Sequence, residues 1–322
     1  MYNLDNILKE AREISWQRFG KRLTMYLPGM FSYDGLRGKY PAISITGSYC
    51  ELQCDHCKGA FLPRMISAKT SEQLADKAFR LAGNGKHGIL ISGGCNRNGR
   101  LPWQRFIGAI GEIKEKTDLF VSIHCGILDY STARGLKEAR VDQALIDVIG
   151  DDETYQQICH VDHGVSKIMD TMESLKKVGI PMVPHVICGL LYGKIISERK
   201  ALKMISMFDP QQLVVVSLMP MPGTPLWGTA PPEAEEVAQI IAEARLLMPD
   251  TRISLGCARR RGDIRLEILA IDAGINRLAL PSEDAVAHAE KYRLEIRYQK
   301  TCCSVSRDFS GLESFHLQTL KV

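Results

Sequence analysis

The sequence has no long hydrophobic run and almost no excess of charge of one sign. Its longest apolar stretches, such as QQLVVVSLMP (211–220), are far shorter than the about 20 residues that a membrane-spanning helix needs. The first residues, MYNLDNILKEAREIS, are charged and lack an apolar signal core, which predicts no secretion. With 41 basic against 37 acidic residues, the formal charge of +4 gives no indication of nucleic-acid binding. We therefore expect a cytoplasmic protein with no membrane and no nucleic-acid partner.

Cysteine, by contrast, is abundant, with ten among 322 residues. Ten cysteines are compatible with disulfides, but a long chain without an export signal is expected in a reducing compartment. Clustered thiols there usually bind metals or take part in chemistry. The cysteines are therefore the first candidates for functional residues.

Short β-branched runs alternate with amphipathic stretches along most of the chain. Strand-like runs lie at 42–47, 88–94, 119–125, 144–150, 182–188, 213–220, 252–257 and 277–282. Helical periodicity lies between them, for instance at 71–83, 103–116, 165–178, 196–207, 232–247 and 262–273. This alternation predicts a parallel sheet, and eight units fit a single (β/α)8 barrel over residues 41–292. A doubly wound open sheet is the alternative.

The two flanks of this region carry different predictions. Residues 1–40 are expected to form one helix followed by a loop that contains glycine and proline. Residues 293–322 begin with a ninth strand-like run, RLEIRYQ (293–299), and continue with KTCCSVSRDF. We expect this C-terminal extension to fold over the mouth of the barrel.

One cysteine motif follows the first predicted barrel strand directly. Its spacing is Cys50-x3-Cys54-x2-Cys57, in the loop at the carboxyl end of that strand, where active sites of parallel α/β folds assemble. Three thiolates without an adjacent fourth ligand do not match a closed structural zinc site, which has four. They match a [4Fe–4S] cluster that leaves one iron open. A zinc site completed by His56 or by a distant cysteine is the alternative.

This motif, with the aromatic His56 before its third cysteine, resembles the signature of the radical S-adenosylmethionine (SAM) superfamily. The resemblance implies that the open iron chelates SAM, whose reductive cleavage yields a 5′-deoxyadenosyl radical. SGGCN resembles the family's glycine pair, which would place Gly93 and Gly94 at the methionine amine. Cys95 stands where most members have an acidic residue. MPMPGTP resembles the loop against the adenine, which implies roles for Met219 and Pro220.

The remaining cysteines divide into three groups. Cys257, Cys302 and Cys303 are predicted to converge at the barrel mouth and hold a second iron–sulfur cluster, with unconnected thiols as the alternative. Cys95, Cys125 and Cys188 lie at or after strand ends, either lining the cavity or filling the core. Cys159 is interpreted as an incidental buried thiol.

Several polar residues also lie at predicted strand ends. His124, Asp147 and His185 can face the barrel cavity and touch SAM or substrate, although core histidines are equally compatible with the pattern. The run Arg259, Arg260 and Arg261 follows Cys257, either as a carboxylate-binding group or as a solvated turn. Ser304 and Ser306 are candidates for a fourth cluster ligand. No catalytic residue is assigned from the sequence.

The whole chain resembles a group related to biotin synthase that includes a partner protein of an archaeal-type, two-protein lipoyl synthase. The motifs that carry this resemblance are GKYPAISITGSYCELQCDHCKG, VPHVICGLLYGKI, MPMPGTPLW, GCARRRG and KTCCSV. Biotin synthase itself fits less well, because its auxiliary-cluster ligands align with positions such as Ser122 and Val183.

The resemblance implies sulfur insertion into a protein-bound octanoyl chain, with the auxiliary cluster as the sulfur donor. It further implies three partners: an octanoylated lipoyl carrier domain or similar acyl substrate, a second radical SAM protein, and an electron donor such as ferredoxin or flavodoxin. Two alternatives remain. One is a radical SAM mutase or C–C bond-forming enzyme without sulfur transfer, and the other is a non-catalytic iron–sulfur or zinc protein.

Overall fold

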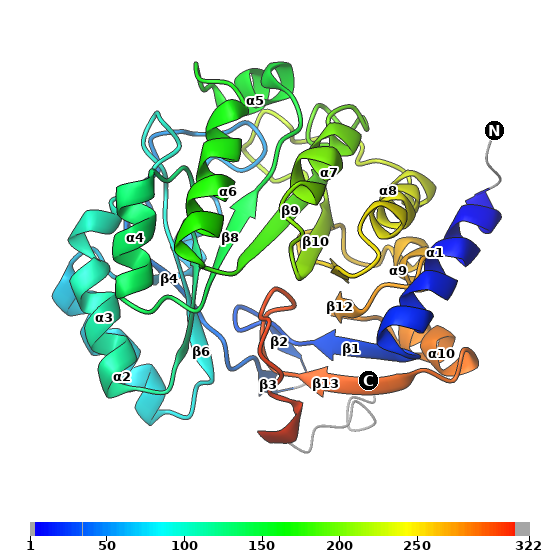
Figure 1. Ribbon diagram of the computed structural model, residues 1–322, viewed down its shortest axis with the longest axis horizontal. Helices are drawn as coiled ribbons and strands as arrows, with labels where there is room; N and C mark the ends of the chain where they lie inside the picture. Colours follow the sequence, from blue (N-terminus) through cyan, green and yellow to red (C-terminus); the bar gives the residue numbers. More distant parts are fainter. Residues whose placement is uncertain (1–3, 34, 313–322) are drawn as a thin grey trace.

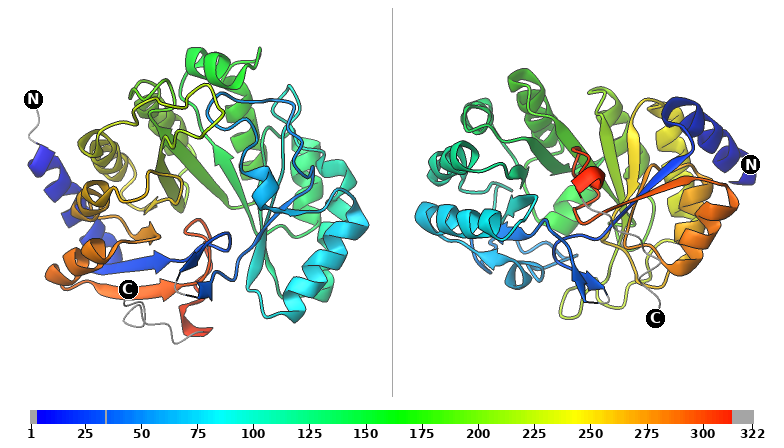
Figure 2. Two further views of the ribbon diagram at one scale, coloured as in Figure 1. Left: turned by 180° about the vertical axis from the view of Figure 1, so that it is seen from behind. Right: turned by 90° about the horizontal axis from the view of Figure 1, so that it is seen from below.

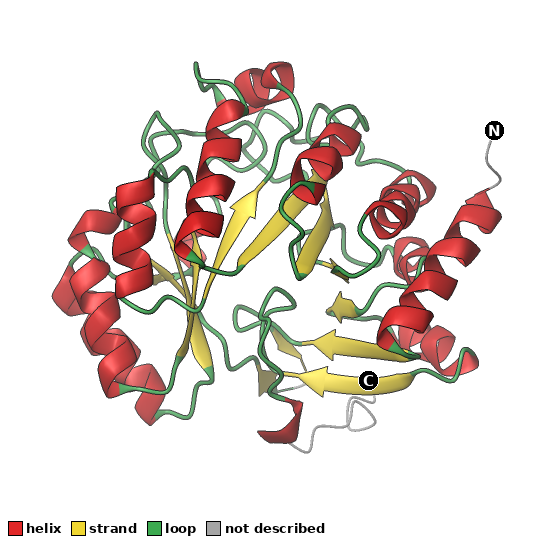
Figure 3. Cartoon of the chain, viewed as in Figure 1, coloured by secondary structure: helices red, strands yellow, loops and turns green. Residues whose placement is uncertain are grey.

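A computed structural model describes residues 4–33 and 35–312. Its centre is an 11-stranded parallel sheet in the order β13-β1-β12-β11-β10-β9-β8-β7-β6-β4-β5. The sheet curls strongly but stays open, with β5 and β13 as its edges (Figure 1). Helices cover its outer face (Figure 3). The inner face of the curled sheet is called the lumen below.

The predicted strand pattern is confirmed in detail. The eight predicted barrel strands appear as β4 (Ala42–Ser44), β6 (Gly88–Ser92), β7 (Phe120–His124), β8 (Gln143–Asp147), β9 (Met182–Cys188), β10 (Gln212–Ser217), β11 (Arg252–Leu255) and β12 (Arg277–Ala279). They lie in the sheet in chain order, so the barrel-type architecture is confirmed and the doubly wound alternative is excluded. The additional β5 (Ile66–Ser67) extends the sheet beyond β4.

The prediction of only a helix and a loop for residues 1–40 is wrong. After α1 (Leu4–Phe19), β1 (Arg22–Tyr26) enters the main sheet between β12 and β13 (Glu295–Gln299). A hairpin of β2 (Ser32–Tyr33) and β3 (Leu36–Arg37) follows. The sequence of β1, RLTMY, shows no clear apolar pattern. Its pairing partners lie more than 250 residues away in the sequence. Long-range pairing of this kind leaves no local signal.

Helices connect the parallel strands on the outside. They are α2 (Ser71–Gly83), α3 (Ile107–Lys116), α4 (Tyr130–Glu138), α5 (Asp152–Cys159), α6 (Ser166–Val178), α7 (Glu198–Ser206), α8 (Ala234–Leu247), α9 (Ile264–Asp272) and α10 (Glu283–Lys291). Short 3-10 turns occupy Leu62–Arg64, Trp103–Arg105 and Ser310–Leu312. Side chains fix several helix starts. Thr70 accepts a hydrogen bond from the Gln73 amide, and Ser282 accepts one from Ala285. No helix in the described part of the chain is long and apolar enough to span a membrane.

Of the three apolar clusters among the described residues, the two largest lie on opposite faces of the sheet. The larger one packs the helices against the outer face, and it includes Cys125 and Cys188. The smaller one fills part of the lumen, and it contains Tyr26, Leu145, Val183, Val214, Val216, Ala279 and Cys303. Alternation along β9 divides the two, because side chains of neighbouring strand residues point to opposite faces. His185 therefore faces the lumen while Cys188 faces the helices.

The C-terminal extension closes an opening of the barrel, but at the end opposite the mouth that carries the Cys50 motif. Its backbone is bound by Gln143, Gln212 and Arg277, which are the first residues of β8, β10 and β12. In Figure 2, the red segment lies within the curve of the sheet when the molecule is seen from below. The predicted position over the mouth is therefore wrong, because the segment after β13 binds to the first residues of these strands and not to their carboxyl ends.

Candidate functional site

The Cys50 motif forms a compact loop after β4. The loop is tied to the turn after β6, because the amides of Glu51 and Leu52 both donate to the carbonyl of Cys95, at 2.8 and 3.1 Å. Inside the loop, the amide of Cys57 donates to the carbonyl of Cys54. Cys54 is buried, whereas Cys50 and Cys57 are half-buried. Three thiols are thus presented by a short segment whose backbone is held at several points.

The glycine pair after β6 allows the two loops to touch. The amide of Gly94 donates to the Thr46 hydroxyl at 2.7 Å. A Cβ atom at Gly94 would lie 2.1 Å from the carbonyl oxygen of Tyr49 and 2.4 Å from the Cα of Cys50. No rotamer change relieves a clash with backbone, so only glycine fits here. The glycine at this position is needed to seat the cysteine loop itself.

A cavity of about 370 Å³ opens between the Cys50 motif and the upper lumen. This volume lies within the range of small-molecule sites. The predicted residues that line it are Cys50, Cys54, Cys57, Gly93, Gly94, Cys95, His124, Asp147, His185 and Met219. Pro220 belongs to the same loop as Met219 but is not part of the cavity lining. The structure therefore brings nearly all predicted SAM-site residues around one space.

A charged pair projects into this otherwise largely apolar cavity. His124 Nε2 lies 3.3 Å from a carboxylate oxygen of Asp147. Burial alone would lower the pKa of His124, but the Asp147 carboxylate raises it above its ordinary value. Burial would likewise raise the pKa of Asp147, yet His124 holds it well below the usual range. Each side chain of the pair therefore favours the charged form of the other.

His185 behaves differently, although its ring centroid lies only 6.0 Å from that of His124. Its Nδ1 is 3.0 Å from the Val183 carbonyl, which can only accept, so Nδ1 carries the proton. Burial lowers the pKa of His185 to about 4. The ring is neutral at pH 7 and leaves Nε2 as a hydrogen-bond acceptor.

Replacing Asp147 by asparagine is expected to lower the pKa of His124, because this carboxylate is the main group that opposes the effect of burial. NMR titration of the imidazole carbons measures this pKa directly. Asp170→Asn, on the exposed face of α6, is the matched control and should leave it unchanged. An unaltered His124 titration in Asp147→Asn would contradict the pairing.

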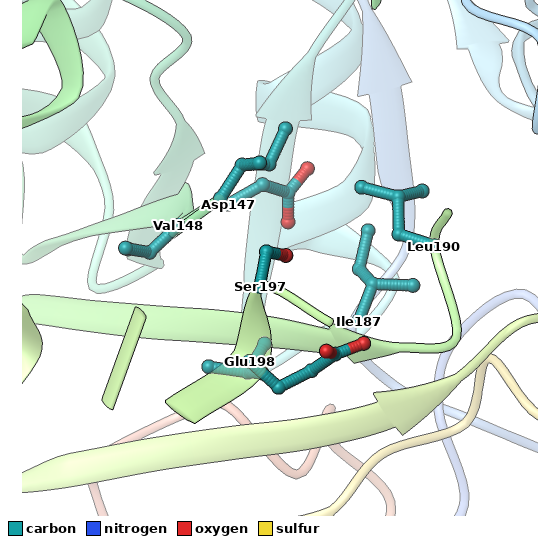
Figure 4. Close-up of a pocket in the computed structure, with 8 residues that line it drawn as sticks. Asp147, Val148, Ile187, Leu190, Ser197 and Glu198 are labelled. Atoms are coloured by element: carbon teal, nitrogen blue, oxygen red, sulfur yellow. The ribbon is translucent and has the colours of Figure 1, made fainter. Parts of the chain in front are cut away.

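A buried glutamate supports the strands that carry these residues. Glu198, at the start of α7, is 1% exposed and accepts hydrogen bonds from the amides of Gly189 and Ile196, both at 2.7 Å. Figure 4 shows it with Ser197 beside a small pocket that Asp147, Ile187 and Leu190 also line. Burial raises its pKa. Glu198 thereby fastens the loop that leaves β9 behind the cavity.

A second group of thiols lies in the lumen. Cys257 enters just after the carboxyl end of β11, whereas Cys302 and Cys303 enter from the amino end of the strands. All three pack in the lumen core, so the predicted convergence occurs inside the barrel and not at its mouth. The Cys303 thiol, followed by the Ser304 hydroxyl, stabilises the Cys302 thiolate and lowers its pKa to about 6. Burial raises the pKa of Cys257 to about 11.

The two serine candidates are separated by the structure. The Ser304 hydroxyl lies 3.2 Å from the Cys302 sulfur, and Ser304 is 1% exposed. Ser306 is exposed, and its amide donates to Gln143. Only Ser304 therefore lies beside the lumen thiols.

Three polar residues that the sequence analysis missed hold this thiol segment. Gln143 binds the backbone of Ser304 and Ser306, and Gln212 donates to the Cys303 carbonyl at 2.6 Å. Arg277 donates to the carbonyls of Cys303 and Val305. The sequence did contain a signal for these residues, because each is a polar residue at the start of a mostly apolar strand. Polar residues repeated at the same level of alternate strands indicate a shared layer inside a barrel.

The arginine run does not act as a single basic group. Arg259 is 1% exposed and forms an ion pair with Glu267 at 2.6 Å. Arg261 donates to the Cys257 carbonyl at 2.8 Å, and Arg260 is exposed. Arg261 is exposed as well, so the interpretation as a solvated turn applies to Arg260 and Arg261 and not to Arg259.

The other candidate cysteines also separate. Cys95 lines the cavity, whereas Cys125 and Cys188 belong to the outer core. Cys159, the last residue of α5, is buried as predicted, and its thiol lies within 4.8 Å of the Cys54 thiol. The alignment positions Ser122 and Val183 carry no thiol. Val183 lies in the lumen core, and the Ser122 hydroxyl lies 2.6 Å from that of Tyr40.

Two family profiles cover most of the chain. The Radical SAM superfamily profile matches residues 44–205, and the Biotin and Thiamin Synthesis associated domain matches residues 215–312. A biotin synthase of Citrifermentans bemidjiense is 30% identical over 198 residues, covering 60% of this chain and 58% of that protein. One of Beijerinckia indica is 32% identical over 154 residues, covering 47% of each chain. The chain thus spans about half the length of these curated relatives.

Solved structures share the fold at lower sequence identity. A methylornithine synthase has a TM-score of 0.62 and 21% identity, covering 95% of this chain and 82% of that one. HydG, a maturase of the [FeFe]-hydrogenase, has a TM-score of 0.64 and 16% identity, covering 86% and 61%. At these identities the likeness concerns the fold of the barrel.

Proposed function

Since this chain belongs to the radical SAM superfamily, we propose that it uses a SAM-derived radical to insert sulfur at an unactivated carbon. Members of this superfamily use a [4Fe–4S] cluster together with SAM. Three soft thiolates of one loop, Cys50, Cys54 and Cys57, fit such a cluster. When bound, the cluster supplies the electron that cleaves SAM, and the resulting radical removes hydrogen from the substrate.

The observation that carries sulfur insertion is the thiol group in the lumen. Cys257, Cys302 and Cys303 meet in one core cluster of the lumen, although they come from different ends of the barrel. Gln143, Gln212 and Arg277 hold the backbone that presents the cysteine pair. Soft ligands in a dry interior suit an auxiliary iron–sulfur cluster as sulfur donor. The relatives named biotin synthase support the same reaction class.

The residues between the two thiol groups would orient the substrate. Ile187 and Val216 supply apolar surface, whereas the His124–Asp147 pair and His185 Nε2 supply fixed hydrogen-bonding groups. A chain with an unactivated C–H bond fits the apolar part. A polar group of SAM or of the substrate would bind the charged pair.

The more specific form of the proposal is one of the two sulfur insertions of lipoyl formation. The substrate would be an octanoyl chain on a carrier domain, a second radical SAM protein would add the other sulfur, and ferredoxin or flavodoxin would supply electrons. The C-terminal cysteine pair supports this form. The non-ligand residues Ser122 and Val183, at the positions aligned with biotin synthase ligands, support it as well.

Counting iron and sulfide after anaerobic reconstitution tests the proposal. The intact chain is expected to bind about eight irons and a Cys257→Ala, Cys302→Ala, Cys303→Ala variant about four, with SAM cleavage retained. Cys125→Ala, Cys188→Ala is the control, because these buried thiols lie on the other face of the sheet.

Four irons in both proteins would remove the sulfur source and favour a mutase or C–C bond-forming enzyme. Absence of SAM cleavage in the intact, reconstituted chain would favour the non-catalytic alternative.

A further inference from the structure

Helix α5 ends directly against the Cys50 motif. The amide of Asp55 donates to the Ile158 carbonyl at 2.8 Å, and the His160 ring lies 2.8 Å from the Asp55 carboxylate. His160 ends the helix with φ +56°, in the left-handed conformation. Two polar contacts thus clamp the helix end to the motif on either side of Cys159. This clamp fixes a fourth cysteine beside the motif.

Side chains that can bind a metal ion lie close together where the helix and the loop meet. The thiols of Cys54 and Cys159 and a ring nitrogen of His56 all lie within 4.8 Å of one another. Cys57 follows His56 in the chain, and its amide donates to the Cys54 carbonyl at 3.1 Å. Together these residues make a set of three thiols and one imidazole.

Two further observations indicate that this set is prepared for a ligand. His56 Nδ1 is buried and has no hydrogen-bond partner among the described residues. Cys54 and Cys159 are only 8% and 5% exposed. Buried polar nitrogens are normally paired, so the orphaned Nδ1 is an unused donor atom on a residue of this set.

We propose that the chain without its iron–sulfur cluster binds Zn²⁺ through Cys54, His56, Cys57 and Cys159. Three cysteines and one histidine are a standard tetrahedral zinc set. On binding, the three thiols release protons to solvent and the imidazole binds in its neutral form. No electron transfer is involved.

Zinc and the cluster exclude each other, because both require Cys54 and Cys57. Cys159 and His56 serve only the zinc state, while Cys50 serves only the cluster. Zinc therefore acts as a competitor of cluster assembly. The inference goes beyond sulfur insertion and does not depend on it.

Zinc titration of the full-length chain tests this site. The chain carries Cys257→Ala, Cys302→Ala and Cys303→Ala, which removes the other thiol group, and is stripped of iron under anaerobic, reducing conditions. Competition with a chromophoric chelator is expected to reveal one tightly bound zinc. Cys159→Ser should weaken its affinity by more than about tenfold, since even outer-shell changes cost 10–100-fold. Cys188→Ser, a buried thiol of the outer core, should leave it unchanged.

Cluster assembly provides the second measurement. One equivalent of zinc should slow the uptake of iron and sulfide by the chain that lacks only the three lumen cysteines. It should slow uptake much less when this chain also carries Cys159→Ser. His56→Phe keeps an aromatic ring but removes the nitrogens, and it should behave like Cys159→Ser. It replaces Cys159→Ser as the test variant if that protein does not fold. Zinc affinity unchanged in both variants, or zinc that does not slow assembly, would overturn the proposal. Neither result bears on sulfur insertion, which the iron count of the lumen variant tests separately.

Discussion

Replacing Gly94 by alanine is expected to block assembly of the SAM-binding cluster and to lower SAM cleavage by more than about a hundredfold. The new Cβ would lie 2.1 Å from the Tyr49 carbonyl oxygen and 2.5 Å from the Cβ of Cys50. Relief requires movement of the backbone that carries the first cluster cysteine. Because altered outer-shell residues already cost 10–100-fold at metal sites, displacement of a ligand should cost more. Iron counting and 5′-deoxyadenosine formation measure the two effects.

Gly93→Ala is the matched control. Its Cβ would contact the Thr46 side chain at 3.1 and 3.2 Å and Ile45 Cγ1 at 3.3 Å, and side chains can adjust by a few tenths of an ångström. We expect Gly93→Ala to keep its iron. If both variants bind iron equally well, the contact between the two loops does not position Cys50. If both lose iron equally, the effect is not specific to the backbone contact at Gly94.

Replacing Arg259 by methionine is expected to lower the free energy of unfolding by about 3–5 kcal/mol, because it leaves the carboxylate of Glu267 buried and unpaired. Arg259 and Glu267 are 1% and 5% exposed. The guanidinium also donates to the carbonyls of Gly256 and Leu280, at 2.6 and 3.1 Å. These contacts join the loop after β11, which carries Cys257, to the loop after β12.

Urea unfolding followed by circular dichroism measures this loss. Arg260→Met, on the exposed neighbour, should change the free energy of unfolding by less than about 0.5 kcal/mol. The double variant Arg259→Met, Glu267→Leu should recover much of the loss, since it removes both buried charges. Equal stability of Arg259→Met and Arg260→Met would contradict the assignment of Arg259 as a structural residue.

The sequence predicts the local features of this protein well. Each of the eight predicted barrel strands is present, because apolar runs and helical periodicity reflect burial against an immediate neighbour. The Cys50 motif is recognisable because its three cysteines lie in one short loop. Of the eight SAM-site residues predicted beyond this motif, seven line the cavity and only Pro220 does not. They follow from a rule of parallel sheets, since carboxyl ends of neighbouring strands meet at one edge.

The features that were missed depend on contacts between distant segments. Strand β1 has its partners near the other end of the chain, and RLTMY alone shows no clear pattern. The side on which Cys302 and Cys303 enter is set by hydrogen bonds from Gln143, Gln212 and Arg277, which lie on strands far from them in the sequence. Cys159 became a candidate ligand only because Asp55 contacts the end of α5.

The sequence alone thus determined the cluster motif, the order of strands and helices, and the presence of extra thiols. The tertiary structure decided that the arginine after Cys257 is a buried ion-pair partner, and that the lumen thiols meet inside the barrel. It also decided that a fourth cysteine lies beside the motif. The physical reason is that local patterns record which residues are buried. Which buried residues meet depends on the pairing and direction of strands that are far apart in the chain.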